Sequence, residues 1–294
     1  MTSARALVTD EGVEVSGADP DGVHQIGSVT KVCTGLLLAL EVVEGALTLE
    51  TRVGELLPEL TGPIGGVTLG QLVTHTSGLP RLPPGMWRKA FGAAARDPYA
   101  DLDESALLAA VAGTSPRPTS RPRYSNLGFG LLGTALTRHR GTTYGALVRD
   151  RVTGPLGMTA TDVHVEEHVP GHTRRGRPHR QAWTFDAMAG AGALWSTVTD
   201  QVRFLRAQLD PPDGVLGEAV RLSQRPLVER GRTGQAMAWM RVTGRDGTLL
   251  WHNGGTAGFR SFVGVDPGRR RAAVVLGSSD RSVDREGFRL VSPR

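Results

Sequence analysis

Apolar residues recur with a strand-like period near both ends of the chain and with a helical period in the middle. Residues 4–9 and 12–16 predict short strands around the turn "TDEG", and strand-like runs return at 236–242, 247–253, 261–267 and 271–279. Helical patterns cover 28–44, 68–75, 103–113, 126–139, 143–152 and 199–209. We expect an α+β fold, in which an antiparallel sheet built from both chain termini is flanked by helices and a helical lobe is inserted.

The length and composition indicate one globular catalytic domain over residues 1–294. We expect residues 1–50 and 190–294 to form a sheet lobe and residues 51–189 a helical lobe, with the site in the cleft between them. No apolar run approaches the roughly 20 residues that span a membrane, and "MTSARALVTD" does not resemble a secretory signal. These observations predict a cytoplasmic protein without a membrane partner. The single cysteine, Cys33, lies in an apolar run and is expected to be a buried structural thiol.

The net charge is +5, and the arginines cluster in three short segments, "SPRPTSRPR", "HTRRGRPHR" and "PGRRRAA". The second contains an Arg-Gly-Arg-Pro arm (Arg175 to Pro178) of the kind that enters an A·T minor groove. One copy in a proline-rich loop is more typical of a solvated surface. We therefore expect no nucleic-acid partner.

The chain has only two lysines, and one of them, Lys31, stands three residues after Ser28 at the start of a predicted helix. This spacing puts both side chains on one helix face. A serine hydroxyl needs a base to become a nucleophile, and a desolvated lysine can act as that base whereas arginine keeps its proton. Ser28 could instead simply cap the helix, and this alternative stays open on Ser-x-x-Lys alone.

Two further stretches carry polar residues suited to a catalytic site. "RYSNLGFG" places Tyr124 and Asn126 where a loop meets a helix, and "WHNGGTAGF" places His252 in a strand that ends in glycines. The alternatives are that Asn126 caps the helix, that Tyr124 is a packed aromatic, and that the His252 ring never meets substrate.

Taken together and in this order, Ser-x-x-Lys, Tyr-x-Asn and His-x-Gly resemble the three signatures of the serine β-lactamase and penicillin-binding protein superfamily. The tyrosine form resembles the class C branch, with its esterase and D-aminopeptidase relatives. The segments "LVTHTSGLP", "GPLGMTATD" and "AGAGALWSTVTDQVRFL" are also similar to segments of this family. The resemblance extends over about residues 25–277.

This resemblance implies a serine hydrolase that cleaves an ester, amide or β-lactam through an acyl-Ser28 intermediate, with no metal or organic cofactor. Lys31 and Tyr124 would share the work of the general base. Backbone N–H groups of Ser28 and Gly255 would form the oxyanion hole. Asn126 would hydrogen-bond the acyl side of the substrate, and the opposite wall would contain His252, Gly254 and Gly255.

The third motif carries His252 where many β-lactamases and cell-wall peptidases carry lysine. With an ordinary pKa of about 6.5, a histidine is mostly neutral at pH 7. This favours esters or amides without a carboxylate. If His252 were instead the cation that binds substrate, hydrolysis of carboxylate substrates should strengthen below about pH 6.

Three other functions compete with hydrolysis. The same acyl-enzyme could pass its acyl group to an amine or alcohol, which would make an acyltransferase, or the scaffold could be a catalytically silent binding module. "HVEEH" (His164 to His168) matches a metalloprotease motif. We expect that segment to be extended, with its histidines about 13 Å apart, which is too far to share one ion.

The segment Leu79 to Asp103 is long and loop-rich, as is typical of segments that set substrate choice. Trp87 and Phe91 within it could line the pocket or belong to the core.

Overall fold

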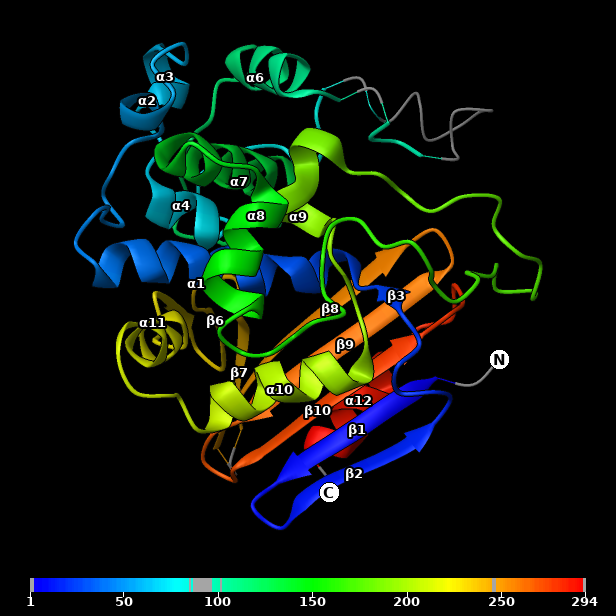
Figure 1. The fold of residues 1–294 in the computed structure, drawn as a ribbon. Coiled ribbons are helices and arrows are strands. Elements are labelled where there is room, and N and C mark those ends of the chain that lie inside the picture. Colours follow the sequence, from blue (N-terminus) through cyan, green and yellow to red (C-terminus); the bar gives the residue numbers. More distant parts are fainter. Residues whose placement is uncertain (1–2, 85, 87–96, 101, 245–246, 293–294) are drawn as a thin grey trace.

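The computed structural model describes residues 3–84, 86, 97–100, 102–244 and 247–292. Its main element is an eight-stranded sheet in the order β2-β1-β10-β9-β8-β7-β6-β5 (Figure 1). The strands are β1 (Ala4–Thr9), β2 (Gly12–Gly17), β5 (Val228–Arg230), β6 (Thr233–Gln235), β7 (Met240–Gly244), β8 (Gly247–Thr256), β9 (Phe259–Asp266) and β10 (Arg271–Gly277). All neighbouring pairs are antiparallel. The predicted antiparallel sheet from both chain ends is therefore confirmed.

Strands from the two ends of the chain pair with each other near one edge of this sheet. β1 pairs with β10 so that Ala4 faces Leu276 and Val8 faces Ala272, and β2 forms the outer edge. A separate two-stranded sheet, β3 (His24–Gln25) with β4 (Trp195–Ser196), follows β2 along the chain. The N-terminal strands thus lead directly into the segment that carries Ser28.

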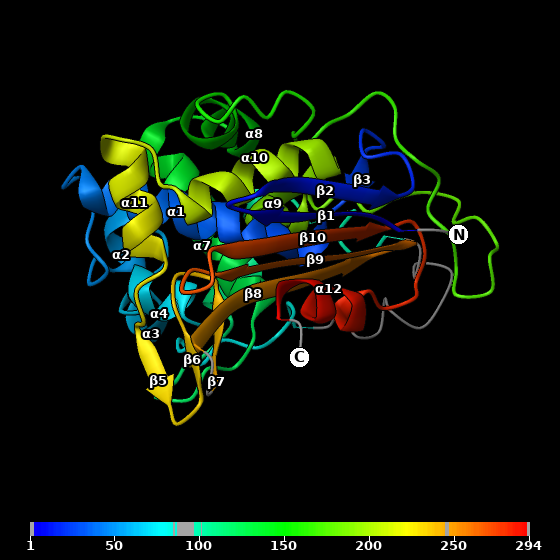
Figure 2. The same ribbon diagram turned by 90° about the horizontal axis from the view of Figure 1, so that it is seen from below.

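Helices cover both faces of the sheet (Figure 2). α10 (Val198–Leu209) packs against β1 and β10 on one face, and α12 (Asp284–Val291) packs against β9 and β10 on the other. Because successive strand residues point to opposite faces, Val274 joins the main core and Val275 joins the small core under α12. The double covering explains why β10 is a continuous apolar run rather than an alternating one.

The helical part of the molecule surrounds α1 (Thr30–Val43), which is buried from Thr30 to Glu41. α1 contacts α11 (Val215–Ser223), α7 (Asn126–Arg140) and α9 (Ala189–Gly192). The remaining helices are α2 (Val53–Leu56), α3 (Gly62–Gly65), α4 (Leu69–Val73), α6 (Glu104–Ala112) and α8 (Tyr144–Val148). Single turns of other helix types lie at Gly27–Val29, Arg149–Thr153 and Asp186–Met188.

Side-chain caps fix where the main helices begin. Asp103 accepts a hydrogen bond from the Ala106 N–H at the start of α6, and Thr197 accepts one from the Asp200 N–H at the start of α10. At the start of α7, Ser125 Oγ accepts from the Gly128 N–H at 2.9 Å. This last cap also fixes the backbone that carries Tyr124 and Asn126 on either side of it.

Most predicted elements are present, but the strand expected from residue 236 begins only at Met240. Ala238 has a left-handed backbone (φ 65°), and its N–H donates to Val73 O rather than to a strand. Short or polar elements were not predicted from the sequence, namely α2, α3, α9, α11, α12, β3, β4, β5 and β6. The helix predicted over 143–152 is α8 continued by the wider turn Arg149–Thr153.

In the part of the chain that the structure describes, no helix is both long and apolar enough to cross a membrane. Cys33 is buried inside α1, and this burial raises the pKa of its thiol to about 12. An inert, packed thiol agrees with the role predicted for it.

Candidate active site

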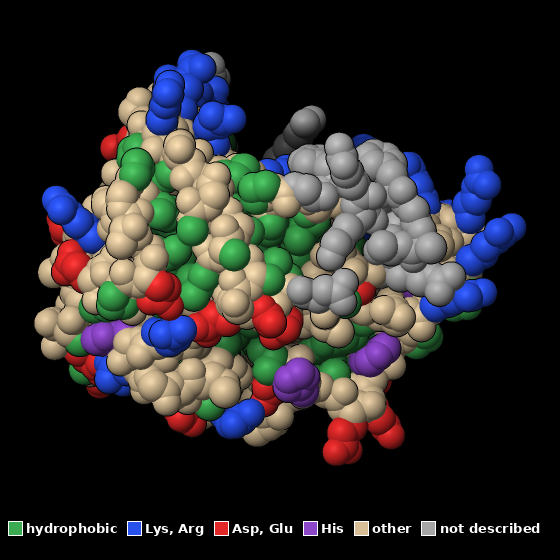
Figure 3. Space-filling model, turned by 90° about the horizontal axis from the view of Figure 1, so that it is seen from above, with side chains coloured by type: hydrophobic (Ala, Val, Ile, Leu, Met, Phe, Trp, Pro, Cys, Tyr) green, Lys and Arg blue, Asp and Glu red, His purple; other side chains and the backbone are tan. Residues whose placement is uncertain are grey.

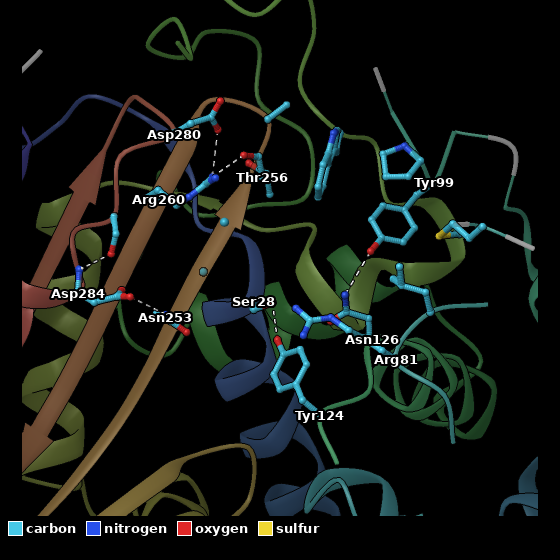
Figure 4. A pocket seen from close by; sticks show the side chains of 18 of the residues that line it. Ser28, Arg81, Tyr99, Tyr124, Asn126, Asn253, Thr256, Arg260, Asp280 and Asp284 are labelled. Carbon is cyan, nitrogen blue, oxygen red and sulfur yellow. Dashed lines mark hydrogen bonds and ion pairs between the residues drawn. The ribbon is translucent and has the colours of Figure 1, made fainter. Parts of the chain in front are cut away.

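Ser28 lies in the turn Gly27–Val29 that leads into α1. Its Oγ accepts a hydrogen bond from Lys31 Nζ at 3.0 Å and another from Tyr124 Oη at 2.6 Å, the latter drawn in Figure 4. The N-cap positions of the turn and of α1 are Ile26 and Val29, and neither has a side-chain cap. The alternative in which Ser28 only caps the helix is therefore wrong, and the first two predicted motifs meet at its hydroxyl.

Lys31 is completely buried, with 0% of its surface exposed. Its Nζ also donates to the carbonyl oxygen of Ala191 in α9 at 2.6 Å. Burial, and after it the positive charge of Arg81, lower the pKa of Lys31 well below its usual range. A deprotonated amine 3.0 Å from Ser28 Oγ can accept the serine proton, which an arginine at this position could not do.

Tyr124 and Asn126 flank the cap residue Ser125. Burial raises the pKa of Tyr124, and the hydrogen bond to Ser28 and the charge of Arg81 partly offset this rise. Asn126 donates from Nδ2 to Tyr99 Oη at 3.3 Å, and its buried Oδ1 has no partner among the described residues. Asn126 does not cap α7, so its free acceptor is available to a bound molecule.

The turn that carries Ser28 lies back to back with the end of β8. Gly27 has a φ of +52°, and a Cβ built on it would lie 2.9 Å from Gly255 N. A Cβ on Gly254 would lie 3.0 Å from Ser28 N. Only glycines allow this approach, which places the amide nitrogens of Ser28 and Gly255 at the same corner of the site. The arrangement suits the oxyanion hole that the resemblance implies.

His252 differs from the expectation that it lines the pocket wall. Its ring is 1% exposed and lies behind the pocket, with its centroid 6.1 Å from that of Tyr124. Its Nδ1 lies 2.7 Å from Asn253 O, and burial, followed by the charge of Lys31, lowers its pKa to about 3. A neutral imidazole at pH 6 does not supply a cation to substrate, so the alternative of a strand histidine fits the structure better.

A pocket of about 790 Å³ opens in front of Ser28. Five of the predicted site residues line it, and Lys31 and His252 are buried behind it. The five are Ser28, Tyr124, Asn126, Gly254 and Gly255.

The wall beyond Gly255 is formed by charged residues that the sequence analysis missed (Figure 4). Arg260 Nη1 lies 3.2 Å from Asp280 Oδ1, and Asp280 Oδ2 lies 2.9 Å from His179 Nε2. Asp284 Oδ2 accepts from Asn253 Nδ2 at 3.1 Å. Arg260 lies opposite Gly255 in the strand register. A charged residue within the apolar run "FRSFVGVD" was the feature of the sequence that could have indicated its place at the site.

The segment Leu79 to Asp103 contributes to the opposite wall, as predicted. Arg81, Leu82, Met86, Pro98 and Tyr99 line the pocket, whereas Trp87 and Phe91 lie outside the described residues. Trp183 completes this wall, with its ring centroid 5.7 Å from that of Tyr99. The Trp183 Nε1–H is buried without a partner in the described part of the chain.

The segment His164 to His168 forms no helix, in agreement with the expected non-helical backbone. His168 stacks on Trp195 with ring centroids 4.4 Å apart, and His164 lines a different cavity. The described residues contain no group of three or more His, Cys, Asp or Glu side chains that could hold a metal ion.

The residues from Arg175 to Pro178 lie in a largely exposed segment that pairs with no strand of the sheet. Figure 3 shows lysine and arginine side chains in separate groups around the visible face rather than in one continuous patch. The absence of a nucleic-acid partner stays a prediction.

Comparison with known proteins agrees with this geometry. The chain is 26% identical over 283 residues to the D-alanyl-D-alanine-carboxypeptidase/endopeptidase AmpH of Escherichia coli (strain K12), covering 87% of this chain and 71% of that protein. It is 23% identical over 281 residues to Protein flp of Staphylococcus aureus (strain COL), covering 88% of this chain and 53% of that protein. The chain therefore spans about half the length of Protein flp.

Solved structures share the fold at low identity. A beta-lactamase/D-alanine carboxypeptidase from Pseudomonas syringae superposes with a TM-score of 0.86 at 17% identity, covering 100% of this chain and 94% of that one. A class C beta lactamase from Rhodobacter sphaeroides has a TM-score of 0.82 at 20% identity, covering 95% and 90%. The family model described as Beta-lactamase matches residues 1–291. With the serine, lysine and tyrosine assembled at one hydroxyl, the chain belongs to the Beta-lactamase family of serine hydrolases.

Proposed function

We propose that this protein cleaves a small ester or amide through an acyl-Ser28 intermediate. The observation that carries the proposal is the pair of hydrogen bonds at Ser28 Oγ, from Lys31 at 3.0 Å and from Tyr124 at 2.6 Å. One partner is an amine whose pKa burial lowers, and the other is a phenol whose pKa burial raises. The site thus offers a proton acceptor and a proton donor to the same oxygen, as acyl transfer requires.

In the proposed reaction, Ser28 Oγ attacks the carbonyl carbon as its proton passes to the Lys31–Tyr124 pair. The negative charge on the carbonyl oxygen would be stabilised by the backbone N–H groups of Ser28 and Gly255. Tyr124 would return a proton to the leaving oxygen or nitrogen as its bond to carbon breaks. Water then repeats the sequence in reverse on the acyl-enzyme and restores the serine.

The pocket supports substrates with a polar acyl side. Asn126 Oδ1 and Trp183 Nε1–H offer an acceptor and a donor that no described residue occupies, so an amide in the substrate could pair with both. His252 is neutral and buried and offers no cation for a substrate carboxylate. The neutral His252 favours a neutral ester or amide, and a D-alanyl peptide would need Arg81 or Arg260, which also line the pocket, to receive its carboxylate.

The proposal is tested by intact-mass spectrometry after brief exposure to p-nitrophenyl acetate, p-nitrophenyl butyrate and benzylpenicillin. We expect an acyl adduct that peptide mapping locates on Ser28 and that Ser28→Ala abolishes. Ser282→Ala is the matched control, because Ser282 also lines the pocket but lies away from Lys31 and Tyr124. An adduct that persists in Ser28→Ala, or no adduct from any donor, would overturn the proposal.

A further inference from the structure

The oxygen of Tyr124 has to carry a negative charge at one stage of the proposed reaction. If Tyr124 takes the Ser28 proton it starts as a phenolate, and if Lys31 takes it Tyr124 becomes a phenolate on protonating the leaving group. Burial raises the pKa of Tyr124, so this phenolate is unfavourable unless a positive charge lies near it. The question is which group supplies that charge.

The titratable groups facing Tyr124 come from four parts of the molecule: Lys31 of α1, His75 after α4, Arg81 and Tyr99 of the following segment, and His252 of β8. Burial lowers the pKa of His75 well below its usual range and that of His252 to about 3, so both rings are neutral at pH 7. The pKa of Lys31 is itself lowered well below its usual range by burial, which favours the neutral amine. Tyr99 is a neutral phenol whose pKa burial raises to about 12.

Arg81 is the permanent cation in this set. Its Cζ lies 5.3 Å from the centroid of the Tyr124 ring, and Figure 4 shows its guanidinium reaching past Asn126 toward Ser28. No carboxylate of the described residues pairs with it, whereas the other pocket arginine, Arg260, pairs with Asp280. A guanidinium that no described carboxylate neutralises can act on a negative charge that develops beside it.

The backbone of Arg81 is attached to the segment that carries Tyr124. Arg81 O accepts from the Asn126 N–H at 2.9 Å, and the preceding carbonyl, Pro80 O, accepts from Ser125 Oγ at 2.6 Å. These bonds hold the loop against the start of α7. The backbone from which the Arg81 side chain reaches the Tyr124 ring is therefore fixed relative to the start of α7.

We propose that Arg81 is a positioning residue for catalysis, whose guanidinium stabilises the phenolate of Tyr124 in place of the cation that His252 does not provide. The inference rests on the proposed acyl-Ser28 chemistry and extends it. Arg81 forms no bond in the reaction: the Ser28 proton moves to Lys31 Nζ, the Tyr124 proton moves to the leaving atom, and Lys31 then returns a proton to Tyr124. Through the middle of this sequence, Arg81 lies beside the ring of a negatively charged Tyr124.

The test compares Arg81→Gln and Arg81→Lys with Arg123→Gln. Arg123 is an exposed arginine one residue before Tyr124 that does not line the pocket, so its substitution removes the same formal charge next to Tyr124 in the sequence. Single-turnover acylation is followed from pH 6 to 10 with p-nitrophenyl butyrate, which is neutral, and with the mono-p-nitrophenyl ester of succinate, which has the same chain length and a carboxylate. Circular dichroism and thermal unfolding check each variant's fold.

Removal of the Arg81 charge should raise the pKa of both Lys31 and Tyr124. At pH 7, we expect the acylation rate constant of Arg81→Gln with p-nitrophenyl butyrate to be about tenfold lower. The rise of this rate constant with pH should shift by about one unit to higher pH, so that the rate recovers in alkaline buffer. Arg81→Lys should keep most of the rate, and Arg123→Gln should follow the unmodified protein.

An unshifted butyrate profile in Arg81→Gln would overturn the proposal. So would a rise of KM confined to the succinate ester, which would make Arg81 a substrate anchor, or an equal loss in Arg81→Lys without a pH shift. Failure of the proposed function looks different, because the unmodified protein would then form no adduct on Ser28 with either ester.

Discussion

At one end of the pocket lie Ser28 and Tyr124, with Lys31 buried behind them, and at the other lie Arg260, Asp280 and His179. The first group is held by a turn, the first turn of α1 and the start of α7, and Lys31 is fully buried. The second group comes from a strand and two loops, and its side chains are 25% to 31% exposed. The proton acceptor at the first end is fully buried, whereas the side chains of the far end are partly exposed.

This difference follows from what each end has to do. A proton acceptor such as Lys31 works only where burial lowers its pKa, so its position relative to Ser28 is set by the helix. Residues that recognise substrate need only reach the pocket, and different loops can supply them. We therefore expect substitutions at the catalytic end to change rate constants and those at the far end to change selectivity.

The largest effect should come from Lys31→Arg. The guanidinium keeps its charge and cannot accept the Ser28 proton, so acylation by p-nitrophenyl acetate should fall about 10³-fold. Lys31→Met, which removes the charge, provides the comparison, and thermal unfolding shows whether either variant is folded. Retention of more than a tenth of the rate by folded Lys31→Arg would mean that Tyr124 alone is the base.

The next effect concerns the dependence of stability on pH. Folding lowers the pKa of His252 to about 3 and that of His75 well below 6.5, so below pH 6.5 the unfolded chain binds protons that the folded chain does not. The free energy of unfolding should therefore fall as the pH drops, by about 1 kcal/mol per pH unit for each histidine.

Urea unfolding at pH 7.0 and pH 5.5 measures this fall. His252→Gln should reduce it by the share of one histidine, and the exposed His164→Gln should leave it unchanged. An identical fall in His252→Gln and the unmodified protein would show that His252 is not neutral and buried as described.

A smaller and more selective effect is expected from Asp280→Asn at the far end. Asp280 accepts from the Gly258 N–H at 3.2 Å and faces both Arg260 and His179. Loss of its charge frees the Arg260 guanidinium, so the KM of an anionic ester should fall about threefold while acylation by neutral p-nitrophenyl acetate stays within about twofold. Equal changes for both esters would remove the distinction between the two ends.

The smallest effect should be that of Trp183→Phe. Because the indole N–H has no partner among the described residues, its loss should change the free energy of unfolding by less than about 0.5 kcal/mol. If the N–H binds substrate, the KM of an amide substrate should rise about threefold with kcat unchanged. A KM within error of the original would show that the indole only packs against Tyr99.

The sequence predicted which side chains meet at Ser28 because the proposed chemistry restricts residue type and spacing, and their catalytic roles stay predictions. Lys31, in the first turn of α1, follows Ser28 in the preceding turn by three residues, and Tyr124 and Asn126 flank a helix cap, so local patterns were sufficient. Arg260 and Arg81 reach the pocket through tertiary contacts, one across a strand pair and one over a ring, which no local pattern encodes. His252 was correctly placed in a strand, but only the structure shows which way its ring is buried.

The same reasoning applies to the fold. Long apolar elements such as β9, β10 and α1 were evident from their patterns. α12 was missed because it has eight residues with Gly287 in the middle, and it is stabilised by packing against Phe262 rather than by its own helical preference. β5 and β6 have three residues each and few apolar side chains, so register with β7 defines them.

The pairing of β1 with β10 has a consequence for how the chain acquires its structure. Ala4 bonds across to the strand that contains Leu276, so these partners are separated by nearly the whole sequence. During synthesis β1 emerges first and keeps one bare, apolar edge until β10 follows, and such an edge invites pairing with other chains. The central sheet can therefore close only after β10 has been synthesised, and a contact between residues so far apart in the sequence is expected to form slowly.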